Sequence, residues 1–138
     1  MNIETILKDG EKPDVRELSS LSLAFIGDSV YELFVRTKIL QGGSRPANEL
    51  HKIAVGYVKA KAQSIAMHNI LDGLTEEEVA IYKRGRNTHI HTVPKNADMN
   101  EYRQATGLEA LVGYLYITGQ TKRLNEVLEA AFAAISRA

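Results

Sequence analysis

Residues 19–31 read SSLSLAFIGDSVY and contain a single charged side chain, Asp28. Apolar residues recur in and after this stretch every three or four positions, which is the spacing of one helix face. We therefore predict a long helix from about Ser20 to Leu40. Gly42 and Gly43 follow it, and glycine readily adopts the left-handed conformation that closes a helix.

The rest of the chain shows the same helical spacing, and no segment alternates for long enough to predict a strand. Further helices are expected from near Pro46 to about Leu71 with one or more breaks, from Thr75 to about Gly85, from about Met99 to Thr118, and from Thr121 to near the C-terminus. The segment 86–97 is polar and lacks periodicity, so we interpret it as a loop. The sequence therefore predicts an all-α helical bundle.

The length and composition are typical of one compact domain, here residues 1–138, with 44% hydrophobic and 25% charged residues. No uninterrupted apolar stretch is long enough to span a bilayer, and the N-terminus lacks the basic-then-apolar order of a secretion signal. The chain has no cysteine, which excludes disulfides and thiolate metal sites. We expect a soluble, cytoplasmic protein in which oxygen or imidazole ligands bind any metal.

The formal net charge is zero, which argues against binding of nucleic acid through bulk charge. The charges are nevertheless segregated: the first 32 residues hold seven acids and three bases, whereas residues 33–71 hold six bases and one acid. A second basic segment runs from Lys83 to Lys95 and contains no acid. Segregation of this kind can produce a basic face on a neutral protein.

Two acids lie alone in long uncharged helical stretches: Asp28 within residues 19–31 and Glu109 within residues 104–121. A carboxylate left without a partner in an apolar interior costs several kcal/mol, so it normally becomes protonated, pairs with a cation or binds a metal. The alternative interpretation is a partly exposed acid or an ordinary salt-bridge partner.

Small residues next to these acids favour a meeting of the two helices. Gly27 precedes Asp28, and Gly107 and Gly113 flank the second acid, so the helices could approach closely. A hard divalent cation such as magnesium fits such a meeting point, because it accepts one or two carboxylates and keeps several waters. Glu32, one turn after Asp28, is either a contributor through water or an ordinary surface acid.

The same two segments carry a resemblance to a known family. LAFIGDS at 23–29 resembles the signature Leu-Glu-Phe-Leu-Gly-Asp-Ala/Ser of the ribonuclease III family, and TGLEALVG at 106–113 resembles its later motif Asp-x-x-Glu-Ala-Leu-x-Gly. The order and helical setting of the motifs agree, and the resemblance covers the chain from residue 18 onward. Two family acids are absent, because Ala24 and Thr106 stand at their positions.

The resemblance implies a ribonuclease III endonuclease-domain-like bundle that is a homodimer and cleaves double-stranded RNA. It implies that Asp28 and Glu109 are the catalytic ligands of Mg²⁺, and that the products carry 5′-phosphate and 3′-hydroxyl ends. Phe25 matches the position where the family inserts an aromatic side chain into the partner subunit, so we expect it at the dimer interface; plain core packing is its alternative.

The segments KRGRN at 83–87 and PKNADMNEYR at 94–103 resemble a short subfamily called Mini-ribonuclease III. That subfamily consists of the catalytic domain without a double-stranded RNA-binding domain. Its implied role is maturation of the 23S ribosomal RNA precursor in bacteria. A ribosomal protein is a candidate partner, since a lone catalytic domain needs a way to select its site.

Recognition of duplex RNA depends mainly on phosphates, 2′-hydroxyls and shape. The expected RNA-binding residues are basic or amide side chains of two segments: Lys52, Lys59, Lys83, Arg84, Arg86 and Asn87. For the two lysines the alternative is a solvated helix face. His89 and His91 have no third ligand nearby in the sequence, so we assign them no role.

A different class of function is also compatible with the sequence. A non-catalytic helical module for RNA binding or ribosome assembly would explain the absent acids at positions 24 and 106. A helical phosphohydrolase acting on nucleotides is disfavoured, because such enzymes need several histidines with adjacent aspartates and the chain has no His-Asp dipeptide.

Overall fold

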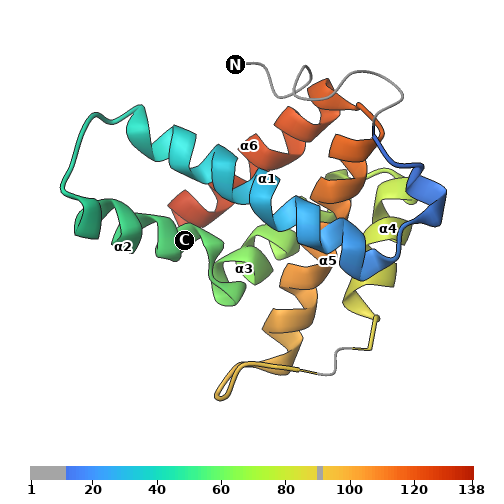
Figure 1. The fold of residues 1–138 in the computed structure, drawn as a ribbon. Coiled ribbons are helices and arrows are strands. Elements are labelled where there is room, and N and C mark those ends of the chain that lie inside the picture. The colour runs from blue at the N-terminus through green and yellow to red at the C-terminus, as the bar shows by residue number, and fades with distance from the viewer. Residues whose placement is uncertain (1–11, 90–91) are drawn as a thin grey trace.

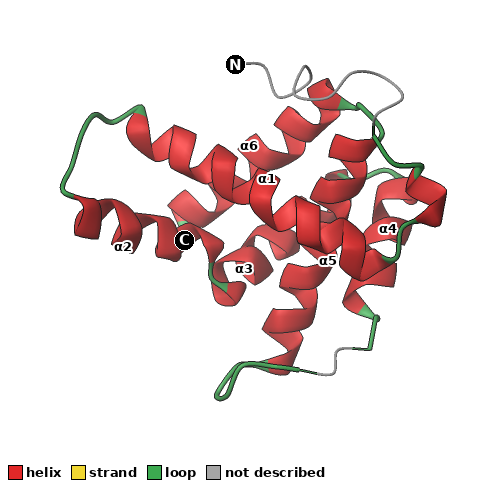
Figure 2. Ribbon diagram, viewed as in Figure 1, coloured by secondary structure: helices red, strands yellow, loops and turns green. Residues whose placement is uncertain are grey.

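The computed structural model describes residues 12–89 and 92–138; residues 1–11 and the pair 90–91, within the expected loop, lie outside the described residues. The described part contains no strand, and its helices are α1 (Ser20–Leu40), α2 (Ala47–Val58), α3 (Ala60–Ile70), α4 (Glu76–Arg86), α5 (Met99–Ile117) and α6 (Thr121–Arg137) (Figures 1 and 2). In the same residues, the 3-10 turn η2 (Val15–Glu17) precedes α1 and the 3-10 turn η3 (Leu71–Gly73) follows α3. The predicted all-α fold is confirmed.

Local capping fixes where α4 and α5 begin. Thr75 Oγ1 accepts a hydrogen bond from the Glu78 N–H at 3.1 Å, and Glu78 Oε1 accepts one from the Thr75 N–H at 2.9 Å, which is the capping box expected from the sequence. The carboxylate of Asp98 accepts a hydrogen bond from the Glu101 N–H at 3.1 Å. These bonds satisfy backbone donors that have no partner within the helix.

The predicted break between Pro46 and Leu71 occurs at Lys59. Its ψ of 154° is extended, so α2 ends at Val58 and α3 starts again at Ala60. Neither glycine nor proline marks this position. The break leaves carbonyl groups at the end of α2 without partners in their own helix.

Helix α5 is the centre of the bundle. Its side chains Leu108, Leu111, Val112 and Leu115 are fully buried. In Figure 1, α1 crosses α5, while α3 and α4 pack beside it. Within the described residues, no helix is both long and apolar enough to cross a membrane.

Candidate active site

Helices α1 and α5 touch backbone to backbone where they cross. A Cβ atom on Gly27 would lie 1.7 Å from the Glu109 carbonyl oxygen, and a Cβ atom on Gly113 would lie 2.0 Å from the Leu23 carbonyl oxygen. Both separations are far below van der Waals contact, so each position requires glycine. The expected close approach at Gly27 and Gly113 is therefore present.

Gly107 has a different neighbour from the one expected. A Cβ atom there would lie 2.6 Å from the Tyr82 ring, so Gly107 makes room for α4. Gly85 of α4 lies in the same contact between α4 and α5, since a Cβ atom added to it would lie 2.9 Å from the Ala110 Cβ atom. The prediction that Gly107 brings α1 and α5 together was wrong; it brings α4 and α5 together.

The crossing of α1 and α5 places the two lone acids side by side. Asp28 is exposed, whereas Glu109 is half-buried. Burial raises the pKa of Glu109 to about 8, and the negative charge of Asp28 and hydrogen bonding between the two carboxyl groups act in the same direction. The pair thus forms a site with one carboxylate open to solvent and one anchored in the bundle.

No cationic side chain of the described residues forms an ion pair with either acid. Among the ion pairs formed by residues 12–89 and 92–138, none includes Asp28 or Glu109. Glu32 pairs with Arg36 at 2.8 Å, and its negative charge also raises the pKa of Glu109. The described residues therefore do not bear out the salt-bridge alternative, whereas Asp28 is exposed, as the other alternative expected. Glu32 has the ion pair of an ordinary surface acid.

A buried amide, Gln63 of α3, contacts Glu109. Its Nε2 lies 3.4 Å from Glu109 Oε2, and this hydrogen bond lowers the pKa of Glu109. The side chain is 2% exposed, and Gln63 Oε1 has no hydrogen-bond partner. Sequence reasoning missed Gln63, because a single neutral amide in a helix has no local signal that distinguishes it from a surface residue.

The positions of the two absent family acids are filled by buried side chains with other contacts. Ala24 is 8% exposed and packs with Leu23 and Ala110. Thr106 is 7% exposed, and its hydroxyl donates to the Tyr102 carbonyl oxygen at 3.0 Å. Neither residue supplies a carboxylate, and within the described chain no three Asp, Glu, His or Cys residues form a group that could hold a metal.

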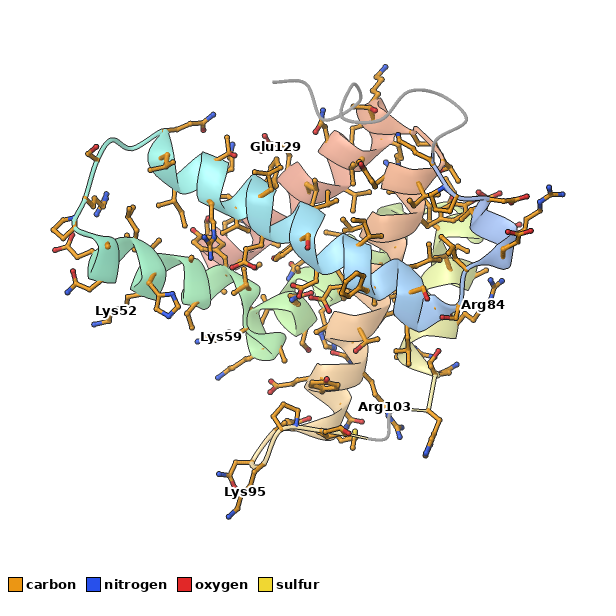
Figure 3. The ribbon with its side chains drawn as sticks, viewed as in Figure 1. Lys52, Lys59, Arg84, Lys95, Arg103 and Glu129 are labelled. Atoms are coloured by element: carbon orange, nitrogen blue, oxygen red, sulfur yellow. The ribbon has the colours of Figure 1, made fainter. Side chains whose placement is uncertain are left out.

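Lys52 and Lys59 lie on α2 and at the α2–α3 break, and both are exposed. In Figure 3 they project toward the lower side of the view, as do Lys95 of the loop and Arg103 of α5, while Glu129 of α6 lies on the upper side. Basic side chains from three segments therefore share one side of the molecule.

The KRGRN segment forms the last turn of α4. Lys83 and Arg84 are exposed. Arg86 is half-buried over the Tyr82 ring, 5.7 Å from its centroid, and its Nε donates to Asn87 Oδ1 at 3.1 Å. Arg86 and Asn87 thus already contact side chains of this chain, whereas Lys83 and Arg84 extend into solvent. His91, from the same basic segment, lies outside the described residues.

Phe25 projects from α1 into solvent and is 82% exposed. Leu21, one turn earlier on the same helix face, is 42% exposed. The core-packing alternative for Phe25 is therefore wrong. An exposed aromatic ring beside an exposed leucine is an apolar patch one turn away from Asp28.

Comparisons with known proteins agree with this arrangement. Residues 21–120 match the family model of the ribonuclease III domain. The Mini-ribonuclease 3 of Thermoanaerobacter sp. (strain X514) is 49% identical, over 97% of this chain and 92% of that protein. The Mini-ribonuclease 3 of Enterococcus faecalis is 48% identical, over 83% of this chain and 89% of that protein.

Solved structures show the same fold. A crystal structure of a protein from Fusobacterium nucleatum superposes with a TM-score of 0.78 and 35% sequence identity, covering 87% of this chain and 96% of that chain. The matched segment 21–120 contains α1 and α5 and, with them, the crossing at which the two acids meet. From the helical fold, the paired acids and the extent of these matches, we conclude that the chain belongs to the ribonuclease III family.

Proposed function

We propose that this chain is a metal-dependent endoribonuclease that cleaves double-stranded RNA to 5′-phosphate and 3′-hydroxyl ends. The observation that carries the proposal is the contact between Asp28 and Glu109 at the α1–α5 crossing, where no lysine or arginine of the described residues pairs with either carboxylate. With no counter-ion beside it, the pair retains a proton, as the raised pKa of Glu109 indicates, and a divalent cation could replace that proton.

The chemistry of the donor set fits magnesium. The site offers two carboxylates, which is the number of protein ligands that Mg²⁺ commonly takes while keeping waters and substrate phosphates in its other positions. Gln63 Oε1 adds a buried acceptor without a partner, and metal-bound water is a hydrogen-bond donor. We propose that Asp28 and Glu109 bind Mg²⁺ directly.

When bound, the cation supplies a water of lowered pKa and stabilises the charge on the leaving oxygen. The chain's own residues perform the remaining tasks. Glu109, anchored on the central helix, fixes the position of the site, and Asp28, exposed on α1, faces the incoming phosphate. We propose that Lys52 and Lys59 bind RNA phosphates on one side, and that Lys83, Arg84, Arg86 and Asn87 form a second contact region.

We propose that the active form is a homodimer. The apolar patch of Phe25 and Leu21 lies one turn from Asp28, so pairing of two copies through α1 would bring two sites close together. Each site would then cut one strand of the duplex. We further propose 23S ribosomal RNA precursor as the substrate, because the 83–103 region resembles the subfamily for which that role is implied, with a ribosomal protein as a candidate accessory partner.

The non-catalytic alternative rests on Ala24 and Thr106, which replace family acids. Because both positions are buried and occupied by packed side chains, loss of these acids leaves the contact between Asp28 and Glu109 intact. We therefore favour catalysis over RNA binding alone.

The deciding experiment incubates the purified protein with long duplex RNA and with structured ribosomal RNA precursor, each with and without Mg²⁺, and maps the ends. Asp28→Asn and Glu109→Gln should abolish cleavage while circular dichroism remains unchanged. The matched control is Glu129→Gln, an exposed acid on the other side of the molecule in Figure 3, which should cut normally. Duplex binding without any Mg²⁺-dependent cleavage by the unmodified protein would establish the non-catalytic alternative.

A further inference from the structure

The described part of the chain has one buried side-chain polar atom that lacks a hydrogen-bond partner, Gln63 Oε1. A buried polar group without a partner costs roughly 1–3 kcal/mol, and such groups are rare in native proteins. A leucine or methionine would fill the same space on α3 without that cost. The presence of an amide in this place therefore requires a reason beyond packing.

The orientation of the amide follows from its neighbours. Gln63 Nε2 donates to the Val58 carbonyl oxygen at 2.9 Å and lies 3.4 Å from Glu109 Oε2. Both neighbours are acceptors when Glu109 is ionised, so a flipped amide would place oxygen against oxygen. The donor side of Gln63 is thus directed at the carbonyl and the carboxylate, and the acceptor side remains free.

The carbonyl that holds Gln63 is available because of the helix break at Lys59. Val58 is the last residue of α2, and its carbonyl oxygen has no partner within that helix. The neighbouring Tyr57 carbonyl oxygen is satisfied in the same manner, since the Tyr31 hydroxyl of α1 donates to it at 2.9 Å. Side chains from α1 and α3 therefore attach the end of α2 to the surroundings of Glu109.

We infer that Gln63 is a positioning residue, which holds the Glu109 carboxylate in the orientation that binds the cation together with Asp28. Its Nε2–H fixes Glu109, the Val58 carbonyl fixes Nε2, and Oε1 accepts a hydrogen bond from a water of the cation's hydration shell. The inference rests on the proposed function of the two acids. Residues that orient metal ligands in this manner typically change metal affinity or activity by roughly 10–100-fold when they are removed.

The test measures Mn²⁺ binding by the RNA-free protein, followed by loss of the electron paramagnetic resonance signal of free Mn²⁺. Gln63→Met keeps the length and removes both polar atoms, and it should weaken Mn²⁺ binding by roughly 10–100-fold. The Mg²⁺ concentration for half-maximal cleavage should rise in parallel. Gln63→Leu provides the same comparison if the methionine variant does not fold.

The matched control is Ser64→Ala on the same helix. Ser64 is also buried, and its hydroxyl bonds to Gln104 rather than to Glu109. The control should lose stability without losing Mn²⁺ affinity. Equal Mn²⁺ affinity of Gln63→Met and Ser64→Ala would overturn the positioning role, provided that Asp28→Asn and Glu109→Gln abolish binding. If those two variants bind Mn²⁺ as the unmodified protein does, the proposed metal site itself is wrong.

Discussion

Gly27 of α1 lies so close to Glu109 of α5 that a Cβ atom on the glycine would fall 1.7 Å from the Glu109 carbonyl oxygen. The next residue after Gly27 is Asp28, so this backbone contact sets the separation between the two carboxylates. Any side chain at position 27 would push the helices apart and separate the acids. The distance between the two acids thus depends on glycine at position 27, which has no Cβ atom.

Gly27→Ala should destabilise the protein and reduce cleavage together. Overpacking typically costs 1–3 kcal/mol, and a clash with backbone should reach at least about 3 kcal/mol because neither helix can yield locally. The matched control is Gly56→Ala on α2, where an added Cβ atom would meet nothing within 4 Å. The control should stabilise the protein by roughly 0.5–1 kcal/mol. Urea denaturation of both variants checks this, and equal stabilities would contradict it.

The stability of the metal-free protein should fall as the pH rises from about 4.5 to about 8, because burial and Asp28 raise the pKa of Glu109 to about 8. Between those values the folded state binds more protons than the unfolded state, so the free energy of unfolding decreases with pH. Glu109→Gln should remove this component. Urea denaturation in chelator at pH 5.5 and pH 8.5 measures it, and identical pH dependence in both proteins would refute the contribution of Glu109.

Lys52→Ala and Lys59→Ala should each weaken binding of duplex RNA with little dependence on sequence. Each lost phosphate contact should reduce the slope of log affinity against log salt by about 1. Anisotropy titrations in the Asp28→Asn background separate binding from cleavage. Lys122→Ala, an exposed lysine of α6, is the control and should leave the slope unchanged. If the salt dependence of binding has the same slope in all three lysine variants, the RNA does not bind at Lys52 and Lys59.

Phe25→Ala should convert the proposed homodimer into a monomer without loss of helical content, because the ring is 82% exposed and contributes little to the core of its own chain. Sedimentation velocity over a concentration series gives the association state. Leu40→Ala, an equally apolar change at the far end of α1, should leave the association unchanged. A monomeric unmodified protein that still made paired cuts would exclude the two-site arrangement.

Arg123→Met should destabilise the protein by roughly 1–3 kcal/mol at neutral pH, since it removes the guanidinium that donates to both oxygens of the buried Glu78 carboxylate. Arg123 Nε lies 2.7 Å from Glu78 Oε2 and its hydrogen bonds lower the pKa of Glu78. The contribution of this ion pair to the free energy of unfolding is therefore complete above the pKa of Glu78 in the unfolded chain, about 4.5, and is lost as the pH falls below that value. Arg16→Met, at an exposed ion pair, should leave the stability nearly unchanged. Thermal melts at pH 7 and pH 3 compare the two.

Much of the helical architecture could be predicted because its signals are local. The capping box of Thr75 and the carboxylate cap of Asp98 mark helix starts in a few residues of sequence, and the observed starts agree. The meeting of Asp28 and Glu109 could also be anticipated, since an acid alone in an apolar helix needs a partner. Their role as metal ligands stays a prediction.

Features that depend on which helix lies opposite could not be predicted. From the sequence, Gly107 was expected to let the helix of Asp28 approach the helix of Glu109. In the structure it makes room for the Tyr82 ring of α4. The role of Gln63 becomes visible only when α3 is packed against α5. The helix break at Lys59 could not be located from the sequence, because neither glycine nor proline occupies that position. Exposure of Phe25 depends on the rotation of α1 about its axis, which packing decides; the family resemblance, and not the helical pattern, indicated an interface position for this residue.

The fully buried residues Leu108 and Ala110 flank Glu109 directly on α5. A helix so enclosed opens to solvent only in rare, large unfolding events, so its amide protons should be among the slowest to exchange. The backbone at Glu109 therefore stays in place as long as the bundle is folded. Heating should abolish cleavage and folded structure at one and the same temperature, with no inactive but still native form in between.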